Sequence, residues 1–189
     1  MATADEERTP PGQALVADFP VLHAGSVMRV DPKSWELTIS GLVEPRAVLD
    51  WDKLVSFPAT EQTCDIHCVT GWTKLDTVWK GVRVSSLFAA LTVLPQAGHV
   101  VIRAKGGWTT NLPLEELMRD DVLAAYEYGG QPISAEHGGP VRLLVPRLYF
   151  WKSAKWLEGI ELTADQRLGY WETRGYHALG DPWLEQRYS

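Results

Sequence analysis

The chain has 189 residues, of which 45% are hydrophobic and 22% are charged, and its formal net charge is -6. This composition is typical of a soluble globular protein, and the length suits one well-packed domain better than two of ordinary size. The negative charge argues against a nucleic-acid-binding surface, and no apolar run approaches the roughly 18 residues that a membrane-spanning helix requires. We therefore expect no nucleic-acid partner and no membrane span.

The N-terminal sequence MATADEERTPPGQ is acidic and contains proline, and it shows neither an apolar signal-peptide core nor a twin-arginine pair. We expect residues 1–17 to form a flexible tail and residues 18–189 to form a single domain that ends in an irregular C-terminal arm. The expected location is cytoplasmic, where the two cysteines of the chain would stay as thiols.

Short strands outnumber helices in the predicted secondary structure. Helix signals fall at residues 51–57, capped by Asp50, at residues 82–94 and just after Pro113. Alternating apolar residues predict a strand up to residue 69, followed by a loop, and further strands at residues 34–43, 99–107, 109–112, 122–128, 141–145 and 156–162. Because strands and helices do not alternate regularly, these elements favour a mixed α+β fold over a doubly wound sheet.

The stretch CDIHCVTGWTKLDTVW, residues 64–79, holds both cysteines and allows three interpretations. Cys64, His67 and Cys68 could supply part of a zinc site, although their spacing lacks a CxxC pair. Cys68 could be a nucleophile with a histidine base. It could also be a single soft thiolate ligand of a redox metal that is held mainly by a separate organic cofactor. No glycine-rich phosphate loop is present, so a nucleotide cofactor is not indicated.

A second informative stretch is HGGPVRLLVPRLYFWKSAKW, residues 137–156, which carries two arginines and two lysines and no acidic residue. These cations could simply be solvated on a strand and a loop. The alternative is an anion site, because arginine offers a planar fork to phosphate or carboxylate and lysine adds a point charge. Nine tryptophans are also many for this length, and they indicate a well-filled core or a pocket for a planar ligand.

These motifs together resemble the molybdopterin-binding domain of the sulfite oxidase family, most of all its small single-domain bacterial branch. The resemblance rests on HCVTGW with WKGV after it, on TTNLPL after a glycine pair, and above all on HGGPVRLLVP followed by KSAKW. It covers residues 14–189. It implies a mixed β-sheet, barrel-like core with short helices, of the sulfite oxidase molybdopterin-binding type.

Site residues follow from the resemblance position by position. It implies that Cys68 is the thiolate ligand of molybdenum. Arg103 or a neighbouring alanine stands where the family has a threonine. The positions that the resemblance assigns to the pterin and its phosphate are Val21, Leu22, His23, His137, Arg142, Lys152, Ser153, Ala154 and Lys155.

The resemblance implies an oxidoreductase that depends on a molybdenum-molybdopterin cofactor and transfers an oxygen atom to or from a small oxo substrate. It also implies no haem in this chain and a separate electron-transfer protein, a cytochrome or a flavoprotein, as partner. The alternative is a non-catalytic module of the same fold that binds molybdopterin or another anion. Metal analysis of the purified protein would separate these two functions.

Sulfite-oxidising enzymes of the family have arginines soon after the ligand cysteine, whereas Lys74 is the first cation after Cys68 here. This difference leaves a sulfite-like anion, a sulfoxide or an N-oxide as possible substrates. Lys74 and Asp76 are the further candidate catalytic residues. Asp76 could relay a proton or hydrogen-bond near the metal, or it could be an ordinary turn residue.

Overall fold

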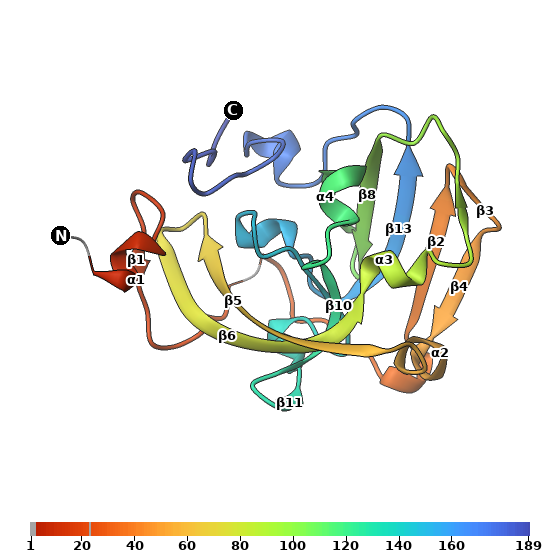
Figure 1. Ribbon diagram of the computed structural model, residues 1–189, viewed down its shortest axis with the longest axis horizontal. Coiled ribbons are helices and arrows are strands. Elements are labelled where there is room, and N and C mark those ends of the chain that lie inside the picture. Colours follow the sequence, from red (N-terminus) through yellow and green to blue (C-terminus); the bar gives the residue numbers. More distant parts are fainter. Residues whose placement is uncertain (1–2, 23) are drawn as a thin grey trace.

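Two β-sheets form the body of the protein in the computed structural model, which describes residues 3–22 and 24–189 (Figure 1). The first sheet has six strands, β1 (Ala14–Leu15), β5 (Ala59–Cys68), β6 (Trp72–Arg83), β10 (Leu123–Tyr128), β11 (Gln131–Pro132) and β12 (Arg142–Leu144). The second has five, β2 (Glu36–Gly41), β4 (Ala47–Asp50), β8 (His99–Ala104), β9 (Trp108–Pro113) and β13 (Leu157–Thr163). A small ribbon pairs β3 (Val43–Glu44) with β7 (Thr92–Val93).

Helices are short and lie between the strands. The α-helices are α1 (Ala4–Glu7), α2 (Trp51–Val55), α3 (Val84–Leu87) and α4 (Leu114–Leu117). Single 3-10 turns occur at Pro32–Ser34, Ala135–His137, Phe150–Lys152 and Glu172–Arg174. In the part of the chain that the structure describes, no helix has the length and apolar character needed to cross a bilayer.

The α+β prediction is confirmed, but the expected barrel does not form. The five-stranded sheet runs in the order β4-β2-β13-β8-β9, so β4 and β9 remain as edges. Within it β2 and β13 are parallel, and the other neighbours are antiparallel. The long strand β6 pairs with β5 on one side and β10 on the other, which makes a second open sheet rather than a closed one.

Two predictions about local structure are wrong. The loop expected after residue 69 is a tight turn, and the polar residues that follow belong to β6 because they pair with β5. The helix expected at residues 82–94 is reduced to α3, because Val82 is still part of β6, opposite Ala124. Tertiary pairing overrides local propensity at both places.

Apolar residues between the two sheets form the main core. Fully buried members from both sheets include Leu37, Ile102 and Ile160 on one side and Val82 and Leu143 on the other. A second cluster gathers around the end of the β5–β6 hairpin and contains Cys68, Trp72, Trp79, Tyr149 and Phe150. This second cluster positions the cavity described below.

Both ends of the chain pack beside the β5–β6 hairpin. β1 pairs with β6 in parallel register, and the Arg8 guanidinium binds Asp65 at 2.5 Å and Asp76 at 2.7 Å. The C-terminal segment, blue in Figure 1, lies on the same side as the hairpin turn. The flexibility of residues 1–17 and the domain boundary at residue 18 stay predictions.

A buried ion pair fastens the C-terminal arm to the core. The Lys152 Nζ atom lies 2.6 Å from Glu172 Oε1, and both side chains are fully buried. Lys152 also donates to the carbonyls of Asn111 and Ala178, and Glu172 Oε1 accepts from Thr110 and Trp151. Because a buried charge without a partner is costly, each member depends on the other.

Replacing Lys152 by Met should therefore destabilise the fold by about 3 to 5 kcal/mol, because Glu172 keeps its charge in a dry interior. The double variant Lys152→Met with Glu172→Gln should recover most of that loss, since the glutamine is neutral. Urea unfolding followed by tryptophan fluorescence measures both.

The control is Arg103→Met, which removes an ion pair to Glu161 from a half-exposed arginine. Its loss should stay within about 1 kcal/mol. Equal losses for Lys152→Met and Arg103→Met would contradict a special role of the buried pair.

Candidate functional site

The end of the β5–β6 hairpin places Cys68 at a cavity. Cys68 is the last residue of β5 and pairs with Trp72, and Gly71 closes the turn between them with a φ of 98°. The Gly71 amide donates to the Cys68 carbonyl at 2.9 Å. The cavity has a volume of about 340 Å³, and Cys68, whose residue is 9% exposed, lines it.

The Cys68 sulfur accepts a hydrogen bond from the Thr70 hydroxyl at 3.2 Å. Burial raises the pKa of the Cys68 thiol, while the Thr70 donors and the positive charges of Arg187 and Lys155 act in the opposite direction. The protonated thiol is therefore favoured, and a metal cation would displace its proton. The sulfur thus has the surroundings of a ligand that ionises when a metal binds.

Arg142 is buried beside the cavity. Its Nη1 and Nη2 atoms donate to the carbonyls of His137 at 2.7 Å and Ser153 at 2.6 Å, and its guanidinium lies 4.2 Å from the centre of the Phe150 ring. Burial lowers its pKa to about 9, so the side chain keeps its charge at pH 7. Its hydrogen-bond partners are neutral carbonyls, and no carboxylate among the described residues forms an ion pair with it.

His137 packs against the cavity wall rather than lining it. Its ring stacks on Phe19 with centroids 3.9 Å apart, and Phe19 lines the cavity. Burial lowers its pKa to about 4, with the charges of Arg142 and Lys155 adding to the effect. The imidazole is therefore neutral at pH 7, and its buried Nδ1 atom has no hydrogen-bond partner among the described residues.

The loop after β12 supplies three predicted residues to the cavity wall, Ser153, Ala154 and Lys155. The Lys155 Nζ atom donates to the carbonyls of Leu22 at 2.9 Å and Glu136 at 2.6 Å. Burial lowers its pKa to about 8. Lys155 and Arg142 are the charged side chains among the described residues that line this cavity.

The structure does not bring Lys152 and Arg103 to the cavity. Lys152 is enclosed by the contacts with Glu172 and neighbouring carbonyls. The Arg103 side chain points away from the cavity and pairs with Glu161, whereas the next residue, Ala104, lines the cavity. The resemblance left either Arg103 or a neighbouring alanine at the position where the family has a threonine. Because side chains alternate along β8, it is Ala104 that faces the cavity.

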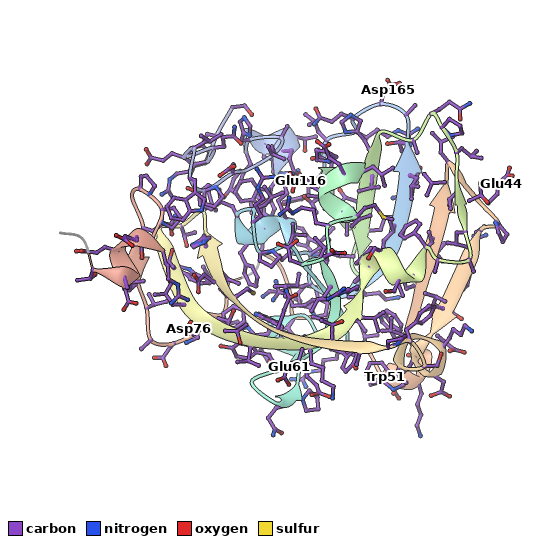
Figure 2. All side chains as sticks on the ribbon, in the orientation of Figure 1. Glu44, Trp51, Glu61, Asp76, Glu116 and Asp165 are labelled. Atoms are coloured by element: carbon purple, nitrogen blue, oxygen red, sulfur yellow. The ribbon has the colours of Figure 1, made fainter. Side chains whose placement is uncertain are left out.

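Lys74 and Asp76 also lie away from Cys68. Lys74 Nζ donates to the Ala17 carbonyl at 2.5 Å. Asp76 is largely exposed, pairs with Arg8 and lies at the edge of the molecule near the N-terminal segment (Figure 2). Of the N-terminal residues that the resemblance assigns to the cofactor, Leu22 lines the cavity and Val21 is half exposed. His23 lies outside the described residues.

Several residues of the cavity wall were not assigned from the sequence. The rings of Trp72, Trp108, Trp151, Trp171 and Tyr176 line it. The high tryptophan content was the signal for such a pocket, but it could not say which rings take part. Thr70 was also missed, because the contact of its hydroxyl with Cys68 depends on the turn geometry.

The zinc and nucleophile interpretations find little support. The described residues contain no group of three or more His, Cys, Asp and Glu that could hold a metal ion. His67 Nδ1 is 2.9 Å from the Thr73 hydroxyl, and burial lowers the pKa of His67 to about 4. Burial also raises the pKa of Cys64 to about 12, and this thiol contacts Thr77.

The cavity fits a planar anionic cofactor that carries a metal. Its walls are aromatic, two uncancelled cations line it and one thiol faces it. The buried nitrogens Trp72 Nε1, His137 Nδ1 and Arg142 Nε have no partner among the described residues. Because buried polar atoms are nearly always hydrogen-bonded, such atoms around one cavity indicate a polar ligand.

Comparisons with known proteins agree with this geometry. Residues 24–171 match the oxidoreductase molybdopterin binding domain. The oxidoreductase YuiH of Bacillus subtilis (strain 168) is 46% identical over 183 residues, which cover 96% of this chain and 92% of the relative. Mitochondrial sulfite oxidase of Homo sapiens is 27% identical over 179 residues, covering 79% of this chain and 33% of the relative.

The crystal structure of the sulfane dehydrogenase SoxCD from Paracoccus pantotrophus is similar in fold, with a TM-score of 0.67 and 25% sequence identity. The similarity covers 74% of this chain and 40% of that chain. The chain therefore spans nearly all of YuiH but less than half of the sulfite oxidase and SoxCD chains. With a matched domain that includes Cys68, Arg142 and Lys155, the chain belongs to the oxidoreductase molybdopterin-binding domain family of sulfite oxidase-like enzymes.

Proposed function

We propose that this chain transfers an oxygen atom to or from a small oxo substrate at a molybdenum-molybdopterin cofactor, with Cys68 as the protein ligand of molybdenum. The observation that carries the proposal is the Cys68 thiol facing a cavity that has aromatic walls and two cations, neither of which has a salt-bridge partner among the described residues. When bound, the cofactor would supply the two-electron redox change and the site of oxygen transfer.

The chain's own residues would hold and orient this cofactor. Arg142 and Lys155 present positive charge to the phosphate, and their carbonyl bonds fix them in place. The indole of Trp72, which lines the cavity, offers a hydrogen-bonding nitrogen to the polar edge of the pterin, and neutral His137 supports the wall by stacking on Phe19. The aromatic walls exclude water and pack against the planar ring system.

Electrons must return to or leave the site after each turnover. We therefore propose a separate electron-transfer protein, a cytochrome or a flavoprotein, as partner, and a cytoplasmic location. Sulfite oxidase and SoxCD, which share the domain, are both named for redox reactions of sulfur. For the substrate of this chain we propose a neutral oxide, such as a sulfoxide or an N-oxide, rather than sulfite.

The substrate proposal rests on the charges near Cys68. Val69 and Thr70 follow Cys68 on the cavity wall, where neither provides a positive charge. Both Nη atoms of Arg142 are already used by carbonyls. If Arg142 and Lys155 hold the phosphate of the cofactor, a sulfite dianion would lose its bound water without gaining a further cation from Val69 or Thr70. That desolvation is costly for a dianion and costs much less for a neutral oxide.

Replacing Cys68 by Ser should lower dye-linked activity by at least about 100-fold, because loss of residues that merely contact metal ligands already costs 10- to 100-fold. The charge-transfer absorption from the Cys68 sulfur to the metal should also disappear. Cys64→Ser is the matched control and should keep both properties, since that thiol contacts Thr77 outside the cavity wall. A Cys68→Ser enzyme with the wild-type spectrum would disprove the ligand assignment.

A substrate screen should favour neutral oxides over sulfite. We expect kcat/KM for a small sulfoxide with a reduced dye to exceed that for sulfite with an oxidised dye by about 10-fold or more. Thr70 is exposed, so Thr70→Arg should fold normally, although it removes the hydroxyl bond to the Cys68 sulfur, and it should shift the ratio toward sulfite. A wild-type preference for sulfite would refute the substrate proposal while leaving the Cys68 assignment intact.

Retention of the cofactor should depend on pH through Lys155. Its pKa of about 8 means that the side chain is an ammonium below pH 8 and loses its charge as pH rises. A bound anion raises that pKa further, so the charge is lost only above pH 8. Losing the charge removes one charge-assisted hydrogen bond to the cofactor, which should make release about 10-fold faster. Fluorescence of the released, oxidised pterin measures the rate.

Lys155→Met should release the cofactor quickly at all pH values between 7 and 9. The control is Lys105→Met, because Lys105 is exposed and its Nζ atom lies 3.9 Å from Glu158. A wild-type pH dependence in Lys155→Met would assign the titration to another group.

A further inference from the structure

The turn that carries Cys68 is bound by both ends of the chain. The Gln13 side-chain amide donates to the Cys68 carbonyl at 3.2 Å, and the Ala14 amide donates to the Gly71 carbonyl at 2.9 Å. From the other end, Arg187 Nη1 donates to the Val69 carbonyl at 2.7 Å. Three of the four carbonyls in residues 68–71 are thus satisfied by segments distant in sequence.

Arg187 joins these two ends to each other. Its Nη2 atom donates to the carbonyls of Gly12 at 3.1 Å and Pro11 at 3.3 Å, while Nη1 holds Val69. Its guanidinium lies 5.3 Å from the centre of the buried Tyr149 ring. Because the guanidinium is planar and rigid, it fixes the position of the turn relative to the N-terminal segment.

The backbone around Arg187 is itself held against the cavity wall. The His177 amide donates to the Arg187 carbonyl at 3.2 Å, and Tyr176 and Tyr188 form an antiparallel bridge. Tyr176 lines the cavity. These backbone contacts therefore fix Arg187 relative to the cavity, although it lies near the end of the chain.

We propose that the two ends of the chain, through Arg187 and Gln13, position the Cys68 sulfur for the metal, an inference that rests on the proposed ligand role of Cys68. Both residues lie outside the matched region 24–171, so the family comparison does not supply this role. The direction of the sulfur depends on the backbone of the turn, and small errors in a metal ligand's position are costly to activity.

The test is Arg187→Met in the molybdenum-loaded enzyme. We expect kcat to fall by about 10- to 100-fold, as for other residues that orient metal ligands. The electron paramagnetic resonance g values and the reduction potential of the metal should shift as well, because the sulfur changes its orientation. In cofactor-free protein, hydrogen exchange in the peptide that contains residues 68–73 should become faster.

Two further variants sharpen the interpretation. Arg174→Met is the matched control, because Arg174 belongs to the same arm but donates to the Tyr170 carbonyl within it. It should leave kcat, the g values, the reduction potential and the hydrogen exchange of residues 68–73 unchanged. Arg187→Lys keeps the charge but has one nitrogen and cannot span Val69 and residues 11–12, so it should resemble Arg187→Met.

If Arg187→Met does not fold, Gln13→Leu tests the same inference, since it removes one bond to the Cys68 carbonyl and leaves Arg187 in place. The inference is overturned if exchange accelerates while the g values and potential stay unchanged, or if Arg187→Lys restores them. A wild-type metal spectrum in Cys68→Ser would instead overturn the proposed function, whatever the Arg187 variants show.

Discussion

The rest of the site depends on the geometry of one tight turn, because this turn determines where the Cys68 sulfur lies. Residues 68–71 must turn the chain from β5 into β6 and at the same time present the Cys68 sulfur to a cavity. A turn of this length cannot satisfy all its own carbonyls, and unsatisfied buried carbonyls are costly. Gln13, Ala14 and Arg187 complete those bonds, so the position of the thiol depends on both ends of the chain.

The distribution of charged side chains around the cavity favours the binding of an anion. Lys152 is neutralised by Glu172 and contributes structure rather than an electric field toward a ligand. Arg142 and Lys155 are bound by carbonyls, which hold them in place but leave their charges uncancelled. Burial lowers the pKa of Arg142 and of Lys155, so a bound phosphate would offset the desolvation cost of these two charges.

Sequence reasoning found the parts of this site whose chemistry is local. Cys68, Arg142 and Lys155 stand in short motifs that keep their spacing, and the structure brings these three to one cavity. It could not find the Arg187 contact, because Val69 and Arg187 are 118 residues apart and only the fold joins them. The loop expected after residue 69 was wrong for a similar reason, since pairing with β5 and β1 outweighs the polar composition of the first half of β6. Lys152 and Lys155 are three residues apart, yet the 3-10 turn Phe150–Lys152 directs one to the interior and the other to the cavity.

The same arrangement separates cofactor binding from substrate selection. The cations that attract a phosphate lie on the loop and strand from residue 137 to residue 156, whereas the residues next to the sulfur are Val69 and Thr70. Residues 137–156 would therefore hold the proposed cofactor, while the wall next to the Cys68 sulfur, formed by Val69 and Thr70, contributes no charge of its own. Relatives of this fold could change substrate by altering one or two positions after the cysteine without disturbing the cofactor loop. The exposed side chain of Thr70 is the position where such a change meets least resistance, because it alters no buried packing.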